Sequence, residues 1–365
     1  MSDAAWPGYQ FDAGNTGAVD RAVPDAVELW WRSEPYFEVL GSPAVAGDDV
    51  IVGALDGTVY AVETDSGDTQ WEYDTGPGPL WSSPAVHDGV ALVGGDDGTL
   101  HALGADTGEP LWRVTAGGPI HSSPTIRDGT AYVGCNDGTV RAYDATTGAA
   151  RWRWDAPSRV CAVPAVADGT VVAAAWHGTV AALDADDGTE RWTVDRDGVV
   201  AASPTVSGDT VVVGDSTGRV AALALADGSE RWSVDAGRTV IASPAVADGV
   251  VYVPAGNTEA DFTPVNGPGP LLALDADDGT EQWRVGTPDD GVGPHAWGSP
   301  VVADGTVCLG TDGADRFFAF DAADGTERWT VPETPTFAWS APAVVDGVVY
   351  VNNRYDGTVA FRDPA

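Results

Sequence analysis

Lysine is absent from the sequence, and its 18 basic residues, all arginines, face 55 aspartates and glutamates in a chain of 365 residues. The formal net charge of −37 excludes the basic stripe that phosphate binding requires, so we expect no nucleic-acid partner. So many like charges repel one another at low salt. The excess of acidic residues therefore predicts the solvated surface of a halophilic, archaeal protein. The alternative is an acidic surface made for a basic partner.

Long apolar runs are also missing. No stretch approaches the roughly 18 apolar residues of a membrane span. The opening MSDAAWPGYQ lacks a basic segment followed by an apolar run. We therefore expect a cytoplasmic protein, or an extracellular or cell-surface one if a signal has been removed, and a monomer. Cys135, Cys161 and Cys308 are too few for a disulfide framework and are expected to be buried small hydrophobes.

A repeat of about forty residues organises what is present. A proline before a short apolar run recurs at steps of 41, 40, 40, 40, 40, 56 and 42 residues, and a tryptophan recurs in the same register. The prolines are Pro43, Pro84, Pro124, Pro164, Pro204, Pro244, Pro300 and Pro342. Each unit contains β-branched runs separated by Asp-Gly or Gly-Asp turns, which predict four antiparallel strands. Such units indicate an all-β, eight-bladed β-propeller.

The two ends of the chain complete one blade between them. Residues 340–362 supply three strands, SAPAV, VVYVN and TVAFR, and the missing fourth strand matches VELWWR around Trp31. We expect this N-terminal strand to close the last blade, which removes open sheet edges. The chain then divides into a lead-in segment, residues 1–27, and one propeller domain, residues 28–365.

A motif spans the third strand, the turn and the fourth strand of each unit, as in ALDADDGTERW at residues 182–192. With alanine first, glycine seventh and tryptophan eleventh, it resembles the tryptophan-docking motif of propellers of the pyrroloquinoline-quinone (PQQ) type. The opening WPGYQFDAGNTG resembles the lead-in of PQQ-like repeat proteins. The resemblance implies that each indole lies on the bare peptide of a turn glycine and ties neighbouring blades together. The chain also resembles the eight-bladed, non-enzymatic outer-membrane assembly lipoproteins, but it lacks their lipid-anchor cysteine and signal, so membrane assembly does not carry over.

One face of the disc is expected to carry the irregular connections. The links from first to second and from third to fourth strand are short and uniform, whereas the links from second to third strand and between blades vary. Two insertions, PAGNTEADFTPVNGPGP at 254–270 and GTPDDGVGPHAWGS at 286–299, fall among the varying links. Because loops carry function on rigid scaffolds, we predict binding on this variable face, around the central channel.

The candidate binding residues break the repeat on this face. Three positions before the repeat prolines stand Leu40, Trp81, His121, Cys161, Ala201, Ile241, Trp297 and Trp339. The tryptophans among them, with Leu40, could form an apolar arc or only pack the blades. Arginines there could hold a carboxylate or phosphate, or pair with nearby aspartates. The candidate set is Trp81, His121, Arg159, Trp176, His177, Arg238, Asn257, His295, Trp297, Trp339, Arg354 and Tyr355.

A PQQ enzyme is the main alternative to a binding propeller. YVPAGNTEADF resembles the loop of PQQ dehydrogenases that carries a calcium-binding asparagine, here Asn257. The positions of their acidic residues hold Ala296 and Gly298, so the general base is missing, and no adjacent cysteine pair is present. In DADDGTE the glycine comes one residue early for a calcium loop, and paired zinc ligands are absent.

We therefore predict a non-enzymatic scaffold that binds a protein partner or small molecule, with no catalytic residue, metal or cofactor. The alternatives are a PQQ- or metal-dependent oxidoreductase that uses PQQ with calcium, and another enzyme at the channel mouth.

Overall fold

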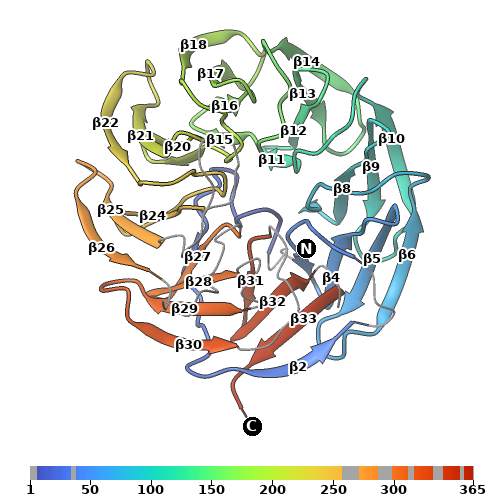
Figure 1. The fold of residues 1–365 in the computed structure, drawn as a ribbon. Coiled ribbons are helices and arrows are strands. Elements are labelled where there is room, and N and C mark those ends of the chain that lie inside the picture. Colours follow the sequence, from blue (N-terminus) through green and yellow to red (C-terminus); the bar gives the residue numbers. More distant parts are fainter. Residues whose placement is uncertain are drawn as a thin grey trace.

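The computed structural model describes residues 6–33, 38–256, 271–286, 298–310, 316–331, 340–353 and 357–364, and it confirms the all-β, eight-bladed propeller. Each blade is an antiparallel sheet whose first strand lies nearest the axis and whose fourth lies at the rim (Figure 1). The second and third strands are rich in valine, alanine and threonine and are almost wholly buried, whereas the rim strands alternate between exposed and half-buried residues. No helix in these described ranges is long and apolar enough to cross a membrane.

The strands follow in chain order. Blades 1 and 2 comprise β3 (Ala44–Ala46), β4 (Asp49–Gly53), β5 (Thr58–Glu63), β6 (Thr69–Asp74), β7 (Ala85–His87), β8 (Val90–Gly94), β9 (Thr99–Gly104) and β10 (Pro110–Thr115). Blades 3 and 4 comprise β11 (Thr125–Arg127), β12 (Thr130–Cys135), β13 (Thr139–Asp144), β14 (Ala150–Asp155), β15 (Ala165–Ala167), β16 (Thr170–Ala174), β17 (Thr179–Asp184) and β18 (Glu190–Asp195). Blades 5 and 6 comprise β19 (Thr205–Ser207), β20 (Thr210–Gly214), β21 (Arg219–Ala224), β22 (Glu230–Asp235), β23 (Ala245–Ala247), β24 (Val250–Pro254), β25 (Leu271–Asp275) and β26 (Glu281–Val285). Blade 7 comprises β27 (Val301–Ala303), β28 (Thr306–Gly310), β29 (Phe317–Asp321) and β30 (Glu327–Val331), joined by β1 (Ala18–Val19).

The two chain ends close the ring as predicted. Blade 8 takes β31 (Ala343–Val345), β32 (Val348–Asn353) and β33 (Gly357–Arg362) from the C-terminal end and β2 (Glu28–Arg32) from the N-terminal end. Strand β2 pairs antiparallel with β33, and Trp31 lies opposite Ala360. This pairing completes the last blade as a four-stranded sheet.

The tryptophans dock on the next blade around the ring. Each of six indole nitrogens donates a hydrogen bond of 2.8–3.1 Å to a carbonyl of the neighbouring third-to-fourth turn: Trp31, Trp71, Trp152, Trp192, Trp232 and Trp283. The turn glycine has a positive φ, and a Cβ on Gly188 would lie 2.7 Å from the ring of Trp152. Trp329 faces blade 8, which has no turn between its third and fourth strands, and donates to the carbonyl of Pro24 instead.

Serines before the repeat prolines link the blades around the axis. The backbone N–H of Ser42 donates to Oγ of Ser83 at 2.8 Å, and Ser83 donates in the same way to Ser123. The same bond recurs from Val163 to Ser203, from Ser203 to Ser243, from Ser243 to Ser299 and from Ala341 to Ser42. These serines therefore hold the inner strands together.

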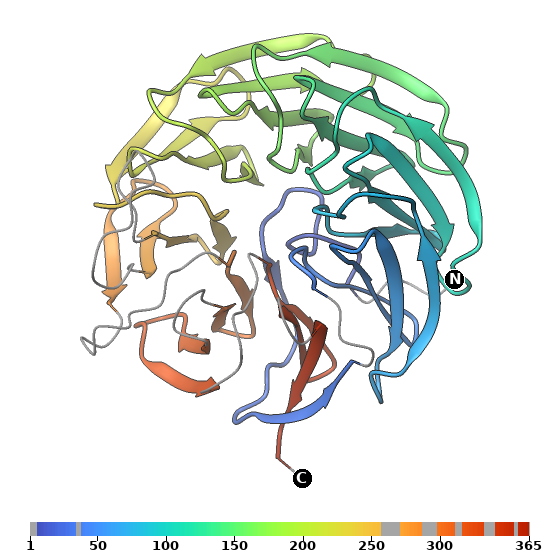
Figure 2. The same ribbon diagram turned by 45° about the vertical axis from the view of Figure 1, so that its right-hand side comes forward.

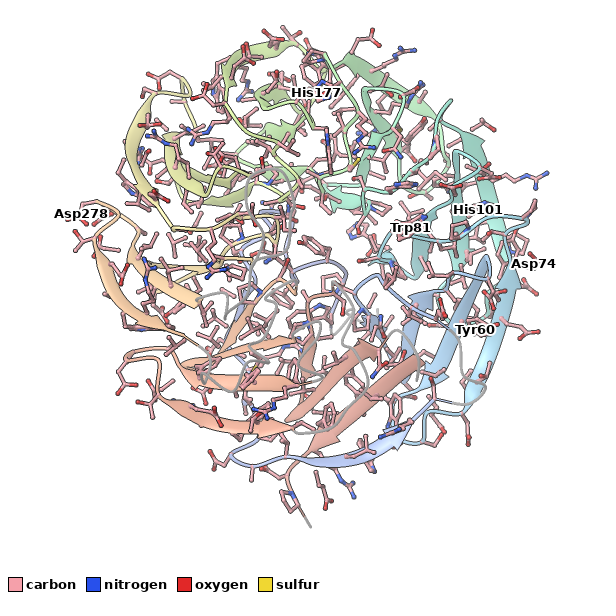
Figure 3. All side chains as sticks on the ribbon, in the orientation of Figure 1. Tyr60, Asp74, Trp81, His101, His177 and Asp278 are labelled. Carbon is pink, nitrogen blue, oxygen red and sulfur yellow. The ribbon has the colours of Figure 1, made fainter. Side chains whose placement is uncertain are left out.

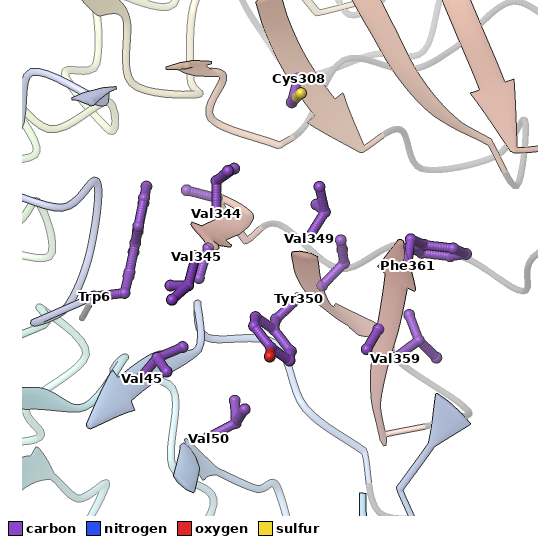
Figure 4. Packing of buried hydrophobic residues seen from close by; sticks show 14 of the residues in the cluster. Trp6, Val45, Val50, Cys308, Val344, Val345, Val349, Tyr350, Val359 and Phe361 are labelled. Carbon is purple, nitrogen blue, oxygen red and sulfur yellow. The ribbon is translucent and has the colours of Figure 1, made fainter. Parts of the chain in front are cut away.

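The lead-in segment occupies the centre of the ring, which the sequence did not predict (Figure 2). Its carbonyls accept hydrogen bonds of 2.6–2.8 Å from the middle valine of six inner strands: Val45, Val86, Val166, Val206, Val246 and Val302. Trp6 is fully buried in the cluster that holds Val45 and Val344 (Figure 4). Gly14 approaches so closely that a Cβ there would lie 2.6 Å from the carbonyl oxygen of Val206. Residues 6–19 thus cover the inner edges of six of the sheets.

Candidate functional site

Two positions of the repeat build the variable face. One is the link position, three residues before each repeat proline; the other is the turn position, two residues before the glycine of the turn between second and third strands. Backbone bonds tie the turn position to the link, at the residue two positions before the link position: Asn136 N donates to Pro119 O at 2.8 Å, and Trp176 N donates to Arg159 O at 2.9 Å. Side chains at these positions are therefore held on a rigid frame while their identity varies from blade to blade.

His121 lies at the centre of a hydrogen-bonded chain across blades 2 to 4. Its Nε2 lies 2.8 Å from Oδ1 of Asp96, and its Nδ1 lies 3.0 Å from Nδ2 of Asn136. The thiol of Cys161 donates to Oδ1 of Asn136 at 3.1 Å. Each link side chain here reaches back to the turn residue of the preceding blade, so the chain joins neighbouring blades.

The chain determines which nitrogen of His121 carries the proton. Because Oδ1 of Asn136 accepts from the Cys161 thiol, its Nδ2 faces Nδ1 of His121 and donates to it. Nδ1 is then an acceptor, and Nε2–H donates to Asp96. In this arrangement the Asp96 carboxylate accepts a hydrogen bond from Nε2 of His121.

Trp81 is an exposed aromatic residue beside this hydrogen-bonded network. Its indole stands 5.7 Å from the imidazole of His121, ring centre to ring centre, at an interplanar angle of 41°. Trp81 is 37% exposed, which makes it one of three large apolar residues exposed to that degree in the described ranges. Figure 3 places Trp81 on the inner side of blade 2. An indole that remains open beside a satisfied polar network is available for contact with a ligand.

Arg159 and Trp176 form a second contact, on blade 4. The guanidinium carbon of Arg159 lies 3.9 Å from the centre of the Trp176 ring, within cation–π distance. His177 follows Trp176, is exposed, and uses its backbone N–H to bind Oγ of Ser158 at 3.0 Å. Burial raises the pKa of the Cys161 thiol, while nearby Arg159 opposes this shift. Cys161 therefore acts as a thiol donor in the chain, without the thiolate character of a nucleophile.

Arg238 stands apart from the other described candidates. It lies in the link into blade 6, and its Nη1 is buried without a hydrogen-bond partner in the described part of the chain. The structure thus brings Trp81 and His121 into contact, pairs Arg159 with Trp176 on blade 4, where His177 follows, and leaves Arg238 on another sector. The other six candidates, Asn257, His295, Trp297, Trp339, Arg354 and Tyr355, lie outside the described residues.

Sequence reasoning missed Asp96 and Asn136 and gave Cys161 no role. Both missed residues occupy the turn position that holds Trp176 in blade 4 and Leu55 in blade 1. The residue at this position differs in chemistry from blade to blade: it is Leu55, Asp96, Asn136, Trp176 and Ser216 in blades 1 to 5. Comparing this position between the repeats could therefore have identified it as a candidate binding position. A turn aspartate or asparagine is common in such repeats, so the departure is easily taken for ordinary turn chemistry.

Comparison with known proteins places this geometry in a family. A family model described as outer membrane protein assembly factor BamB matches residues 24–84, 75–175, 128–259, 176–287 and 267–365. No curated protein matches the chain.

Among solved structures, the chain resembles BamB from Moraxella catarrhalis with a TM-score of 0.70 and 20% identity, over 86% of this chain and 93% of that one. The quinohemoprotein alcohol dehydrogenase from Comamonas testosteroni has a TM-score of 0.79 and 18% identity, over 99% and 81% of the two chains. The computationally designed protein Ika8 has a TM-score of 0.78 and 19% identity, over 92% and 100%. Likeness at these identities shows the shared fold, and the family match extends over nearly the whole propeller. The chain therefore belongs to the BamB-like family of PQQ-type β-propeller repeats.

Proposed function

We propose that this protein is a non-enzymatic binding propeller that holds a protein partner or small ligand on its variable face. The observation that carries the proposal is the convergence of repeat-breaking side chains on blades 2 to 4. His121, Asp96 and Asn136 hold one another in place, and Trp81 beside them is 37% exposed. A preorganised polar network next to an open indole is typical of a recognition site.

A PQQ enzyme fits these residues poorly. The resemblance to PQQ dehydrogenases implies that those enzymes carry an acidic residue at the position that Gly298 occupies in this chain. A Cβ on Gly298 would lie 2.8 Å from the carbonyl oxygen of Gly310 and 3.2 Å from that of Ser340, so a carboxylate there would require the backbone to move. The three cysteines, two of them buried, stand far apart in the sequence and provide no adjacent pair. The PQQ group therefore does not match the residues present.

A pull-down from the native lysate, with matched variants, tests the proposal. Trp81→Leu alters the proposed site, whereas Asp186→Asn changes an exposed turn residue between β17 and β18, on the opposite face. We expect a component that wild type and Asp186→Asn retain and that Trp81→Leu loses. Equal retention by all three proteins would place binding elsewhere.

A thermal melt tests the enzyme alternative. We expect PQQ with calcium to leave the melting temperature unchanged, because a ligand stabilises a fold only in proportion to its binding. Stabilisation by the pair together, with neither component alone sufficient, would favour the quinoprotein alternative.

A further inference from the structure

We infer that the surface between Trp81 and Asp96 binds a guanidinium or ammonium group. This inference rests on the proposed binding function and names the chemistry of the ligand. Three features of the described residues carry it: an open aromatic face, a partly exposed carboxylate, and contacts of both groups with the same imidazole. The sign of the whole molecule's charge adds a fourth.

The aromatic face of Trp81 has no cation over it in the described ranges. Its ring partner there is the imidazole of His121, which is tilted by 41° and leaves the indole 37% exposed. Trp176, two blades on, shows the occupied version of such a site, because Arg159 lies 3.9 Å from its ring centre. An indole is the best aromatic acceptor for a cation, and Trp81 has room for one from outside the chain.

The Asp96 carboxylate supplies the negative charge. Its side chain is 40% exposed, and among the described residues its ion-pairing partner is the imidazole of His121 at 2.8 Å. The other ring nitrogen of that imidazole lies 3.0 Å from Nδ2 of Asn136. The carboxylate accepts one hydrogen bond at Oδ1 from the imidazole, and among the described residues no hydrogen bond reaches its second oxygen. A guanidinium or ammonium group would form the stronger, charge-assisted hydrogen bond there.

Trp81 and Asp96 lie close enough to share one cation. Both contact the same imidazole, at 5.7 Å between ring centres for Trp81 and 2.8 Å for Asp96. The link that carries Trp81 also folds against Asp96, since a Cβ on Gly78 would lie 3.4 Å from the Cβ of Asp96. A planar or rounded cation on the indole can thus reach the carboxylate.

Long-range electrostatics favours the same sign. The net charge of −37 attracts cations to the surface and repels carboxylates and phosphates. Two sources can supply the cation, an arginine or lysine side chain of a protein partner and a free ammonium compound. Both sources present a cation to the site, and the probes below distinguish between them.

Calorimetric titration at fixed ionic strength tests the inference with three probes. N-acetyl-arginine amide represents a peptide side chain, N-acetyl-citrulline amide is its neutral counterpart, and tetramethylammonium represents a free ammonium compound. We expect one of the two cations to bind at one site, and citrulline amide to bind roughly tenfold more weakly or not at all. The cation that binds identifies the source.

Variants show where the cation binds. Asp96→Asn and Trp81→Leu should each weaken cation binding about tenfold, while Asp186→Asn on the opposite face leaves it unchanged. Thermal melts of the variants establish that they are folded. Equal affinity for arginine and citrulline amides, no binding of either cation, or equal affinity in all variants would overturn the inference. If Trp81→Leu still abolishes retention in the pull-down under those outcomes, the binding function stands with a ligand of different chemistry.

Discussion

Replacing Trp71 and Trp112 by phenylalanine isolates the hydrogen bond of the docking motif. The two residues are half-buried in neighbouring blades, and both rings lie on turn glycines, where a Cβ on Gly108 or Gly148 would come within 2.5 and 2.6 Å of them. Nε1 of Trp71 donates to the carbonyl of Ala105 at 3.1 Å, whereas Nε1 of Trp112 is buried without an acceptor in the described part of the chain. Both substitutions remove similar ring area and differ in this bond.

The difference between the two variants measures the bond. Trp71→Phe leaves a carbonyl unpaired, and Trp112→Phe removes an unsatisfied donor, so the first should cost about 1–2 kcal/mol more free energy of unfolding. For a chain of this size, that is a gap of about 1–3 °C in melting temperature. Paired thermal melts in one high-salt buffer should resolve it. Equal losses, or a larger loss for Trp112→Phe, would refute the assignment of an anchoring role to the indole N–H.

Three further predictions concern the lead-in segment, the polar chain and pH. Gly14→Ala should lower the melting temperature, because its Cβ would lie 2.6 Å from the carbonyl oxygen of Val206, whereas Gly286→Ala, with no atom of a described residue within 4 Å, should not; equal melts would contradict this. Nitrogen-15 NMR should show that Nε2 of His121 carries a proton and that Nδ1 accepts the hydrogen bond of Asn136; a proton on Nδ1 would contradict the hydrogen bonds assigned to Asn136 and Asp96. Burial and neighbouring carboxylates raise the pKa of Asp49 from 3.8 to about 6. Because folding raises this pKa, the ionised carboxylate lowers the stability of the folded state above pH 6. Asp49→Asn should therefore raise the melting temperature at pH 8, and this gain should disappear as the pH falls toward 4. A gain that does not change with pH would contradict this prediction.

The repeat made the scaffold predictable. Blade number, ring closure by β2 and the docking tryptophans follow from residues that recur in register, such as Gly188 beneath Trp152. Each is required by local chemistry: a turn that needs a positive φ, a ring that needs a bare peptide, or a sheet that needs its fourth strand. Because the same local structure recurs from blade to blade, the residues that form it recur at a regular spacing in the sequence.

Features that occur once were harder to predict. The lead-in binds inner strands through backbone groups and through side chains such as Asn15, whose Nδ2 donates to the carbonyls of Val163 and Pro204, and these contacts leave no periodic pattern in the sequence. Trp329 docks on Pro24 because blade 8 lacks a turn at that point, which becomes visible only after the ring has closed. Asp96 and Asn136 resemble ordinary turn residues until the link side chain His121 meets them both. These contacts depend on tertiary placement rather than on sequence pattern.

A crystal structure with the cation that titration selects would test the binding site most directly. The account predicts that cation over the indole of Trp81, within about 6 Å of the ring centre and in contact with the Asp96 carboxylate. Density confined to the opposite face, or none at a saturating concentration, would contradict it.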